Sequence, residues 1–267
     1  MLADRYGCVL FDLDGVLYRG EEAVPGAPET LARLRASGTR VAFLTNNSSR
    51  TAEQVAAKLE RLGIPAEPSE VVTSALATAD LLAARGGGTA FVIGGEGIER
   101  ALAEAGLVVL HGEPDRADLV VVGIDEGLTY ADLRTACILV RRGSRLLATN
   151  VDPTFPADGG DLWPGAGALV SAITTATGVQ PEVVGKPFAP LFEAARRRAG
   201  GGSPLVVGDR LDTDIAGAAA LGWDSMLVLT GVSTREELAG GSIRPTYVAE
   251  DVGALVVEDV SGARAQK

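Results

Sequence analysis

The stretch Val9-Leu10-Phe11-Asp12-Leu13-Asp14-Gly15-Val16 decides how the chain is interpreted, because an apolar run ends there at two aspartates one residue apart. A short apolar run before a glycine-containing break is typical of a buried strand in a parallel sheet. In open α/β sheets, ligands bind just beyond the carboxyl ends of such strands. Asp12 and Asp14 are therefore either turn residues that end a strand or carboxylates placed for chemistry. Two carboxylates this close repel each other unless a proton or a cation lies between them.

Length and composition describe a globular chain with enough apolar residues for one large domain or two smaller ones. The chain has 267 residues, of which 46% are hydrophobic, and a mean hydropathy of +0.20. No apolar run approaches the roughly 18 residues of a membrane span, and Met1-Leu2-Ala3-Asp4-Arg5 lacks a signal-peptide pattern. Cys8 and Cys137 suit small hydrophobic positions better than a disulfide framework. We therefore expect a cytoplasmic protein with no membrane partner.

The charge balance and the histidine content exclude several classes of function. A formal net charge of −11 leaves no basic stripe for phosphates, so we expect no nucleic-acid partner. The single histidine, His111, excludes a multi-histidine zinc site and leaves one candidate base for a Ser-His-Asp triad. Its Gly-Glu-Pro-Asp context is typical of a surface turn. The chemistry is therefore expected to use carboxylates, a lysine and neutral polar groups.

Apolar runs typical of strands alternate with helical patterns along the chain, which predicts an α/β fold with a mainly parallel sheet covered on both faces. The segment 149–165 is expected to be a long polar loop. Glycines at 94, 95 and 97 resemble the start of a dinucleotide-binding fingerprint, but Arg100 replaces its last glycine, which favours an ordinary strand-to-helix turn. The expected strands cover 9–11, 40–44, 71–73, 90–93, 119–122, 146–148, 183–184, 205–207, 225–229 and 246–248.

Polar side chains follow four of the expected strands, at the point where each strand ends. If these strands are parallel neighbours, the side chains line one rim of one sheet. Each cluster alone also has a structural explanation, such as a turn, a solvated charge or a helix N-cap. Four such clusters together favour a shared site. The strand-end residues are Asp12 and Asp14, Thr45 and Asn46, Lys186, and Asp209 with Asp214.

These residue types suit phosphoryl transfer through an aspartyl-phosphate. A carboxylate can act as a nucleophile and form a covalent intermediate, whereas the phosphoryl group mainly needs donors and a cation. Mg²⁺ is usually held by one or two carboxylates, waters and the substrate phosphate. Asp12 and Asp209 can supply the carboxylates, with a backbone carbonyl near Asp14 as a further ligand. Thr45 and Asn46 can hold the non-bridging phosphate oxygens.

The sum of charges points to the same cation. Asp12, Asp14, Asp209 and Asp214 bring four negative charges against one lysine, Lys186, before any phosphate arrives. Such crowding should raise the pKa of at least one carboxyl group. We expect Asp14 to hold that proton and to give it to the leaving-group oxygen.

Taken in order, the motifs resemble those of haloacid dehalogenase-superfamily phosphatases. The long gap between the second and third motifs is similar to the subgroup with a large α/β cap, which includes NagD-like, p-nitrophenyl phosphatase-like, phosphoglycolate and glycerol-3-phosphate phosphatases. The resemblance implies a Rossmann-like doubly wound core at 1–78 and 182–267, with an inserted α/β cap domain at 79–181. The four motifs are Asp12-Leu13-Asp14-Gly15-Val16, Thr45-Asn46, Lys186-Pro187 and Gly208-Asp209-Arg210-Leu211-Asp212-Thr213-Asp214.

The resemblance also implies roles for the aspartates. Asp12 would be the nucleophile and a Mg²⁺ ligand. Asp14 would be the general acid and base and would bind Mg²⁺ through its backbone carbonyl. Asp209 would be the third protein ligand, and Asp214 would support the ligands without binding the metal itself. An acid at Asp14 favours a phosphatase over a dehalogenase, because a halide leaves without a proton.

Further residues would hold the phosphate group, and the cap would select the substrate. The resemblance assigns the phosphate to Thr45, Asn46, Asn47 and Lys186. In the cap, residues 150 and 152 (Asn and Asp) are of interest, although a structural turn is the favoured explanation for both. Homodimerisation through the cap is a further expectation from the resemblance.

The sequence thus predicts a Mg²⁺-dependent phosphomonoester hydrolase that acts on a small soluble metabolite. The resemblance favours glycerol 3-phosphate or 2-phosphoglycolate, with p-nitrophenyl phosphate as an artificial substrate. One alternative is a phosphotransferase or phosphomutase that uses the same aspartyl-phosphate. Another is a non-catalytic protein that binds a phosphometabolite, but the loss of a catalytic carboxylate that usually marks such proteins is absent here.

Overall fold

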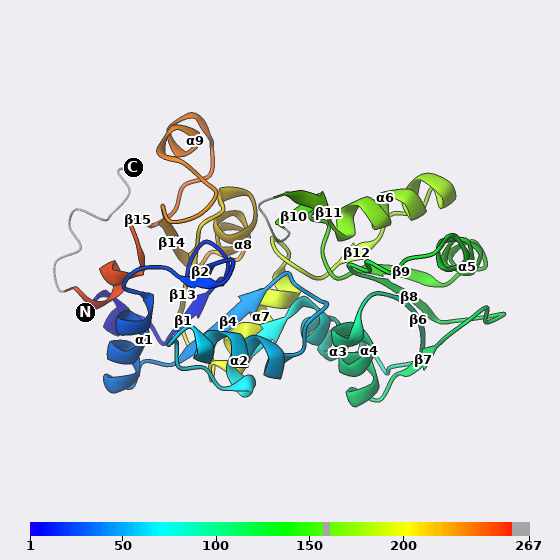
Figure 1. Ribbon diagram of the computed structural model, residues 1–267, viewed down its shortest axis with the longest axis horizontal. Helices are drawn as coiled ribbons and strands as arrows, with labels where there is room; N and C mark the ends of the chain where they lie inside the picture. The colour runs from blue at the N-terminus through cyan, green and yellow to red at the C-terminus, as the bar shows by residue number, and fades with distance from the viewer. Residues whose placement is uncertain (157–160, 258–267) are drawn as a thin grey trace. The chain divides into compact units, whose positions relative to one another are not determined.

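The computed structural model describes residues 1–156 and 161–257, and its contacts divide the chain into two compact units. The first unit contains Met1–Thr45, Ala52–Val72 and the segment from Lys186 onward, whereas the second contains Asn46–Thr51 and Thr73–Gly185. Both units alternate strands and helices, which confirms the predicted α/β class (Figure 1). The assignment of 79–181 as a cap stays a prediction, because compactness alone does not define a lid.

A six-stranded sheet forms the centre of the first unit, and every residue of its strand β1 (Cys8–Phe11) is buried. Burial on both faces explains why this strand is a continuous apolar run in the sequence. β1 pairs in parallel with β4 (Val41–Thr45) on one side and with β13 (Pro204–Gly208) on the other. The order is β15-β14-β13-β1-β4-β5, where the outer strands are β5 (Val71–Thr73), β14 (Asp224–Val228) and β15 (Tyr247–Ala249).

Helices pack closely on this sheet. The helix α7 (Ala189–Arg198) contacts β1 and β4, and α8 (Ala216–Ala220) contacts α7 and β14. A side chain at Gly217 of α8 would overlap the ring of Phe192 in α7, so the glycine permits the close contact of the two helices. The other helices described in this unit are α1 (Ala27–Ala36), α2 (Ala52–Arg61) and α9 (Arg235–Gly240).

A short hairpin directly follows the first strand of the core. It pairs β2 (Tyr18–Arg19) with β3 (Glu22–Ala23) in antiparallel fashion, and Val24 N donates to the Leu17 carbonyl at 2.9 Å. Strands of two residues are too short to show an alternating pattern, so the sequence analysis did not predict this hairpin.

The second unit contains a five-stranded parallel sheet in the order β12-β9-β8-β6-β7. Its core includes Val120, Leu139 and Ile173, from a strand and two helices. Across residues 1–156 and 161–257, no helix has the length and apolar character needed to cross a membrane. The strands are β6 (Thr89–Ile93), β7 (Val108–Leu110), β8 (Leu119–Val122), β9 (Arg145–Ala148) and β12 (Glu182–Val183); the helices are α3 (Ser74–Ala84), α4 (Glu96–Glu104), α5 (Tyr130–Arg141) and α6 (Ala166–Thr177) (Figure 1).

The segment predicted as a long polar loop contains two strands instead. β10 (Thr154–Pro156) and β11 (Leu162–Pro164) pair antiparallel, with Phe155 opposite Trp163. Their rings meet edge to face at a centroid distance of 6.1 Å, a cross-strand aromatic contact that stabilises such a pair. The interval between the strands, 157–160, lies outside the described residues. The prediction was wrong at these strands because the prolines that flank the aromatics indicated a loop.

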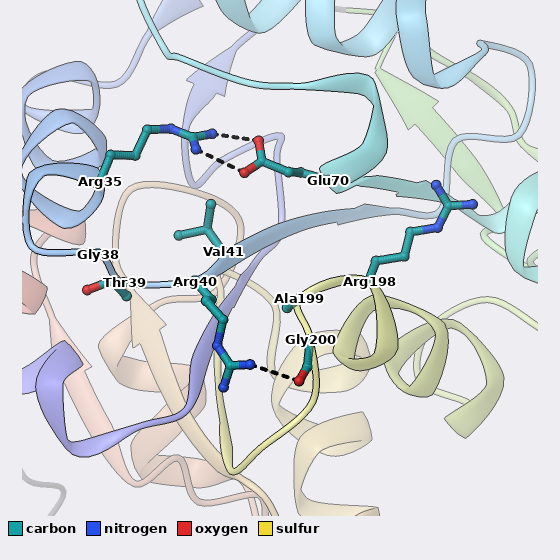
Figure 2. Close-up of a pocket in the computed structure, with 9 residues that line it drawn as sticks. All are labelled: Arg35, Gly38, Thr39, Arg40, Val41, Glu70, Arg198, Ala199 and Gly200. Carbon is teal, nitrogen blue, oxygen red and sulfur yellow. Dashed lines mark hydrogen bonds and ion pairs between the residues drawn. The ribbon is translucent and has the colours of Figure 1, made fainter.

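A pocket of about 380 Å³ lies where β4 begins, at the opposite end of that strand from Thr45 (Figure 2). Its guanidinium groups are used for structural contacts. Arg35 binds Glu70 with two hydrogen bonds of 2.6 and 2.9 Å, and Arg40 Nη1 donates to the Gly200 carbonyl at 2.8 Å. Gly200 follows the end of α7, where carbonyl groups lack helical partners. These arginines therefore connect the segments that contain Glu70 and Gly200 to the amino end of β4.

Candidate active site

The ends of β1 and β13 bring Asp12 and Asp209 together. Phe11 of β1 is in register with Val207 of β13, and Asp12 N donates to the Val207 carbonyl at 2.9 Å. Both aspartates are buried, with 8% of Asp12 and 1% of Asp209 exposed. The parallel pairing of these two strands therefore places two of the strand-end clusters at one rim.

Lys186 lies between two carboxylates at this rim. Its Nζ atom is 2.7 Å from Oδ1 of Asp12 and 2.7 Å from Oδ1 of Asp214. Only 4% of Lys186 is exposed, and a charge buried this deeply requires paired partners. The strand-end lysine predicted from the sequence is thus in direct contact with the predicted nucleophile.

Asp214 holds Lys186 in place through the second of these contacts. While its Oδ1 binds Lys186, its Oδ2 accepts a hydrogen bond from Arg210 N at 3.2 Å. Asp214 is fully buried and lies in the π-type turn Leu211–Ile215 that follows β13. A side chain at Gly208 would overlap the Asp214 carboxylate, so glycine permits this turn to fold back onto the strand end.

The acidic cluster fits a divalent cation. One oxygen each from Asp12, Asp209 and Asp214 lies within 4.8 Å of the other two. In the described part of the chain, Asp209 Oδ1 is buried without a hydrogen-bond partner, whereas its Oδ2 accepts from Val232 N at 2.7 Å. A buried carboxylate oxygen without a partner is costly unless a cation binds it. Since both oxygens of Asp214 are engaged, Asp12 and Asp209 are the carboxylates that fit Mg²⁺.

Two glycines make room for Asp209. A Cβ atom at Gly15, which has a φ of +80°, would lie 2.5 Å from Asp209 Oδ2, and one at Gly231 would overlap the same oxygen. Thr230 Oγ1 donates to the Gly15 carbonyl at 2.6 Å. The segment 230–232 follows β14, so a further strand end contributes to the site. This strand end was not among the predicted site residues, although the strand-end rule points to it as well.

Burial raises the pKa of all three buried aspartates. Asp12, Asp209 and Asp214 each shift from 3.8 to about 6, mainly because they lose water, and neighbouring carboxylates add to the shift. The positive charge of Lys186 opposes the shift at each of them. Burial would lower the pKa of Lys186, but the charges of Asp12 and Asp214 raise it above its ordinary value. One lysine thus offsets only part of the negative charge, and the remaining negative charge favours the binding of a cation.

Asp14 differs from the buried aspartates because its side chain is exposed. Loss of water to the surrounding protein still raises its pKa, and the charge of Lys58 in α2 opposes the rise. Its backbone forms an isolated bridge with Tyr18, where the β2–β3 hairpin begins. A rim carboxyl with a raised pKa is suited to hold a proton and to release it.

The second motif lies at a boundary, because Thr45 ends β4 in the first unit whereas Asn46 and Asn47 belong to the second. Asn46 Nδ2 donates to Asp152 Oδ2 at 3.0 Å, and its carbonyl accepts from Asn150 Nδ2 at 2.8 Å. Asp152 N also donates to Asn150 Oδ1 at 3.1 Å, which closes a local turn. Asn150 and Asp152 therefore form a turn that holds Asn46. The assignment of Thr45, Asn46 and Asn47 to a phosphate group stays a prediction.

Two family models match the chain, one over its first part and one over its last part. The model described as haloacid dehalogenase-like hydrolase matches residues 9–108, which include Asp12 and Asp14. The model described as HAD-hydrolase-like matches residues 183–255, which include Lys186, Asp209 and Asp214.

Two phosphatases and a further protein, NagD, are similar to this chain over nearly its whole length. An acid sugar phosphatase of Staphylococcus aureus is 40% identical over 257 residues, which cover 95% of this chain and 98% of that protein. A glycerol phosphate phosphatase from Mycobacterium tuberculosis, solved in complex with magnesium, has a TM-score of 0.93 at 40% identity. The match covers 99% of this chain and 81% of that protein. NagD from E. coli K-12 has a TM-score of 0.86 at 32% identity, with coverages of 94% and 98%.

Proposed function

This chain belongs to the haloacid dehalogenase-like hydrolase family, and we propose that it hydrolyses the phosphate ester of a small polyol or sugar, with glycerol 3-phosphate as the leading candidate. It is a phosphoric monoester hydrolase of the family's phosphatase group, and its cofactor is Mg²⁺. The names of the sugar phosphatase and glycerol phosphate phosphatase relatives support the substrate class. The other substrate implied by the sequence, 2-phosphoglycolate, is the main competitor.

The observation that carries the proposal is the arrangement of Asp12, Lys186 and Asp209. Lys186 Nζ lies 2.7 Å from Oδ1 of the nucleophile Asp12, and Asp209 offers a buried oxygen that has no partner among the residues that the structure describes. When bound, Mg²⁺ supplies positive charge for the phosphate oxygens and for the attacking carboxylate. The site thus combines a nucleophile, a fixed cationic side chain and a metal ligand at one rim, which phosphoryl transfer requires.

Two steps account for hydrolysis with the residues present. In the first, an oxygen of Asp12 attacks phosphorus, and the bond from phosphorus to the ester oxygen breaks as Asp14 gives its proton to that oxygen. In the second, ionised Asp14 takes a proton from water while the water oxygen attacks phosphorus. Phosphate leaves, and Asp12 regains its carboxylate. Lys186 offsets the charge that builds up on the phosphate oxygens, and Asp214 keeps Lys186 in place.

The proposal assigns the remaining roles to the second motif and the second unit. Thr45, Asn46 and Asn47 would hold phosphate oxygens together with Lys186. The inserted domain, predicted at 79–181, would act as the cap that admits water at the right stage and selects the leaving group. A homodimer formed through this domain belongs to the same proposal, and light scattering of the purified protein measures its mass.

A phosphate-release screen tests the proposed function. The panel contains glycerol 3-phosphate, 2-phosphoglycolate, several sugar phosphates and p-nitrophenyl phosphate, each with Mg²⁺ and with a chelator. We expect Mg²⁺-dependent release with the highest kcat/KM on a polyol or sugar phosphate, and no turnover by Asp12→Asn, whose amide is not a competent nucleophile. Residual activity of Asp12→Asn would contradict the covalent mechanism. Phosphate that appears on an added acceptor instead of in solution would identify a phosphotransferase.

A further inference from the structure

Lys58 is a buried cation that none of the steps above uses. It lies on α2 with 9% of its surface exposed. Its Nζ atom lies 4.1 Å from the centroid of the Tyr18 ring and 3.1 Å from Oε1 of Glu21. Tyr18 belongs to β2 and Glu21 to the turn before β3, so both contacts are made to the hairpin. A lysine is rarely buried unless it is paired, which makes these contacts the reason for its position.

The hairpin is joined tightly to the catalytic stretch. Tyr18 N donates to the Leu13 carbonyl at 3.2 Å, and Gly15 N donates to the Tyr18 carbonyl at 2.8 Å. Asp14 lies within this closed turn and bridges to Tyr18. A shift of Tyr18 must therefore move the backbone that carries Asp14.

A second contact holds the hairpin at another point. Arg19 Nε donates to the Thr230 carbonyl, and Thr230 Oγ1 donates to the Gly15 carbonyl. Thr230 therefore fixes the polar backbone of the turn, whereas Lys58 fixes the aromatic side chain next to it. The ring contact should dominate on the Lys58 side, because the side chain of Glu21 is 69% exposed and exposed ion pairs contribute little.

We propose that Lys58 is a positioning residue, which holds the β2–β3 hairpin through the Tyr18 ring and thereby keeps the Asp14 carboxyl where it meets the leaving-group oxygen. This inference rests on the proposed phosphomonoesterase activity. Lys58 itself touches no reacting atom in this scheme. Its loss should therefore lower the rates of both steps that use Asp14 and leave phosphate binding largely unchanged.

Steady-state kinetics of Lys58→Met and Lys58→Arg test the inference. The methionine keeps the apolar stem and removes the charge, and we expect kcat for glycerol 3-phosphate to fall roughly tenfold with KM within about a factor of two. The loss in kcat/KM should be smaller for p-nitrophenyl phosphate than for glycerol 3-phosphate, because the nitrophenol leaving group needs no proton. Lys58→Arg should recover most of kcat, because a guanidinium group also binds an aromatic face. Arg61→Met is the matched control, since Arg61 is exposed on the same helix.

A double-mutant cycle separates positioning from general damage. If Lys58 acts through Tyr18, the variant that combines Lys58→Met with Tyr18→Leu loses no more kcat than the worse single variant. Hydrogen exchange should be faster at the amides of 17–24 in Lys58→Met, with the amides of β13 unchanged. Additive losses, an Arg variant no better than the Met variant, or wild-type kcat in Lys58→Met would overturn the inference.

The two proposals can fail separately. If the wild-type protein hydrolyses no phosphate ester in the screen, the proposed function fails, and hairpin exchange in Lys58→Met still decides whether Lys58 holds the hairpin. If the wild type is active and Lys58→Met matches it on both substrates, the proposed function stands and the role of Lys58 is wrong.

Discussion

The ammonium nitrogen of Lys186 lies 2.7 Å from Oδ1 of Asp12. Lys186→Met removes the cationic partner of Asp12 and Asp214, whose carboxylates are both buried. We expect a loss of roughly 100-fold or more in kcat and of about 3 kcal/mol in the free energy of unfolding. Phosphate release and urea unfolding measure the two effects.

A matched control for this variant comes from an exposed ion pair. Arg85 lies 2.7 Å from Glu182, with 38% and 42% of the two side chains exposed. Arg85→Met should therefore cost less than about 1 kcal/mol. If Lys186→Met costs no more than this control, the buried pairing does not stabilise the fold.

Asp14→Asn should separate substrates by their leaving groups. An amide cannot protonate the ester oxygen, so an alkyl phosphate such as glycerol 3-phosphate should lose roughly 100-fold or more in kcat/KM. An aryl phosphate with an acidic phenol should lose much less in kcat/KM, because its oxygen leaves as a stable anion. Comparing kcat/KM for the two substrates checks this, since kcat also contains the hydrolysis step in which Asp14 serves both substrates. Equal losses would argue against Asp14 as the acid.

The stability of the metal-free protein should rise as the pH falls from about 6 to about 4. Asp209 has a pKa of about 6 in the folded chain against an ordinary value of 3.8, so in this range the folded state holds a proton that the unfolded chain has lost. A lower pH then favours the folded state. Urea unfolding in a chelator should show this slope in the wild type and a weaker slope in Asp209→Asn. The same slope in both proteins would contradict the assignment.

Mg²⁺ should stabilise the protein through the carboxylates of Asp12 and Asp209. A concentration one hundred times the dissociation constant adds about 2.7 kcal/mol to the free energy of unfolding. Asp209→Asn should lose most of the rise in Tm that Mg²⁺ produces. Asp14→Asn should keep it, since Asp14 is expected to bind the metal through its backbone carbonyl. Thermal unfolding with and without Mg²⁺ measures this, and a rise equal in all variants would place the metal elsewhere.

Gly231→Ala should weaken metal binding although no ligand residue is replaced. The new methyl group would overlap Asp209 Oδ2 and displace the carboxylate. Loss of such support around a ligand typically costs about 10- to 100-fold in metal affinity. The Mg²⁺ concentration for half-maximal activity reports the change. Gly240→Ala is the control, because a Cβ atom there would have no neighbour within 4 Å.

The strand-end aspartates could be predicted from the sequence because their position depends on local pattern alone. Asp12 and Asp209 each follow an apolar run, and the rule for parallel sheets then places them at one rim. The engagement of both Asp214 oxygens could not be predicted, because it depends on the π-type turn that follows β13. The contribution of Val232 could not be predicted for a different reason: it acts through its backbone N–H, a group that every residue except proline offers.

Two contacts between separate segments could not be predicted from the sequence either. The burial of Lys58 depends on Tyr18, from a hairpin too short to show periodicity. The strands β10 and β11 depend on the pairing of Phe155 with Trp163. The contact of Lys58 with Tyr18 joins residues too far apart in the chain for a local pattern, whereas Phe155 and Trp163 pair locally in strands too short to show alternation.

The place of β1 inside the core sheet has a consequence for synthesis on the ribosome. β1 emerges first, but one of its two edges has no partner until β13 emerges, because Val9 pairs with Leu205. All strands of the five-stranded sheet lie between Thr89 and Val183 and emerge before that point. We therefore expect the second unit to fold first during translation, while the unpaired backbone edge of β1 stays exposed to chaperones and to other nascent chains.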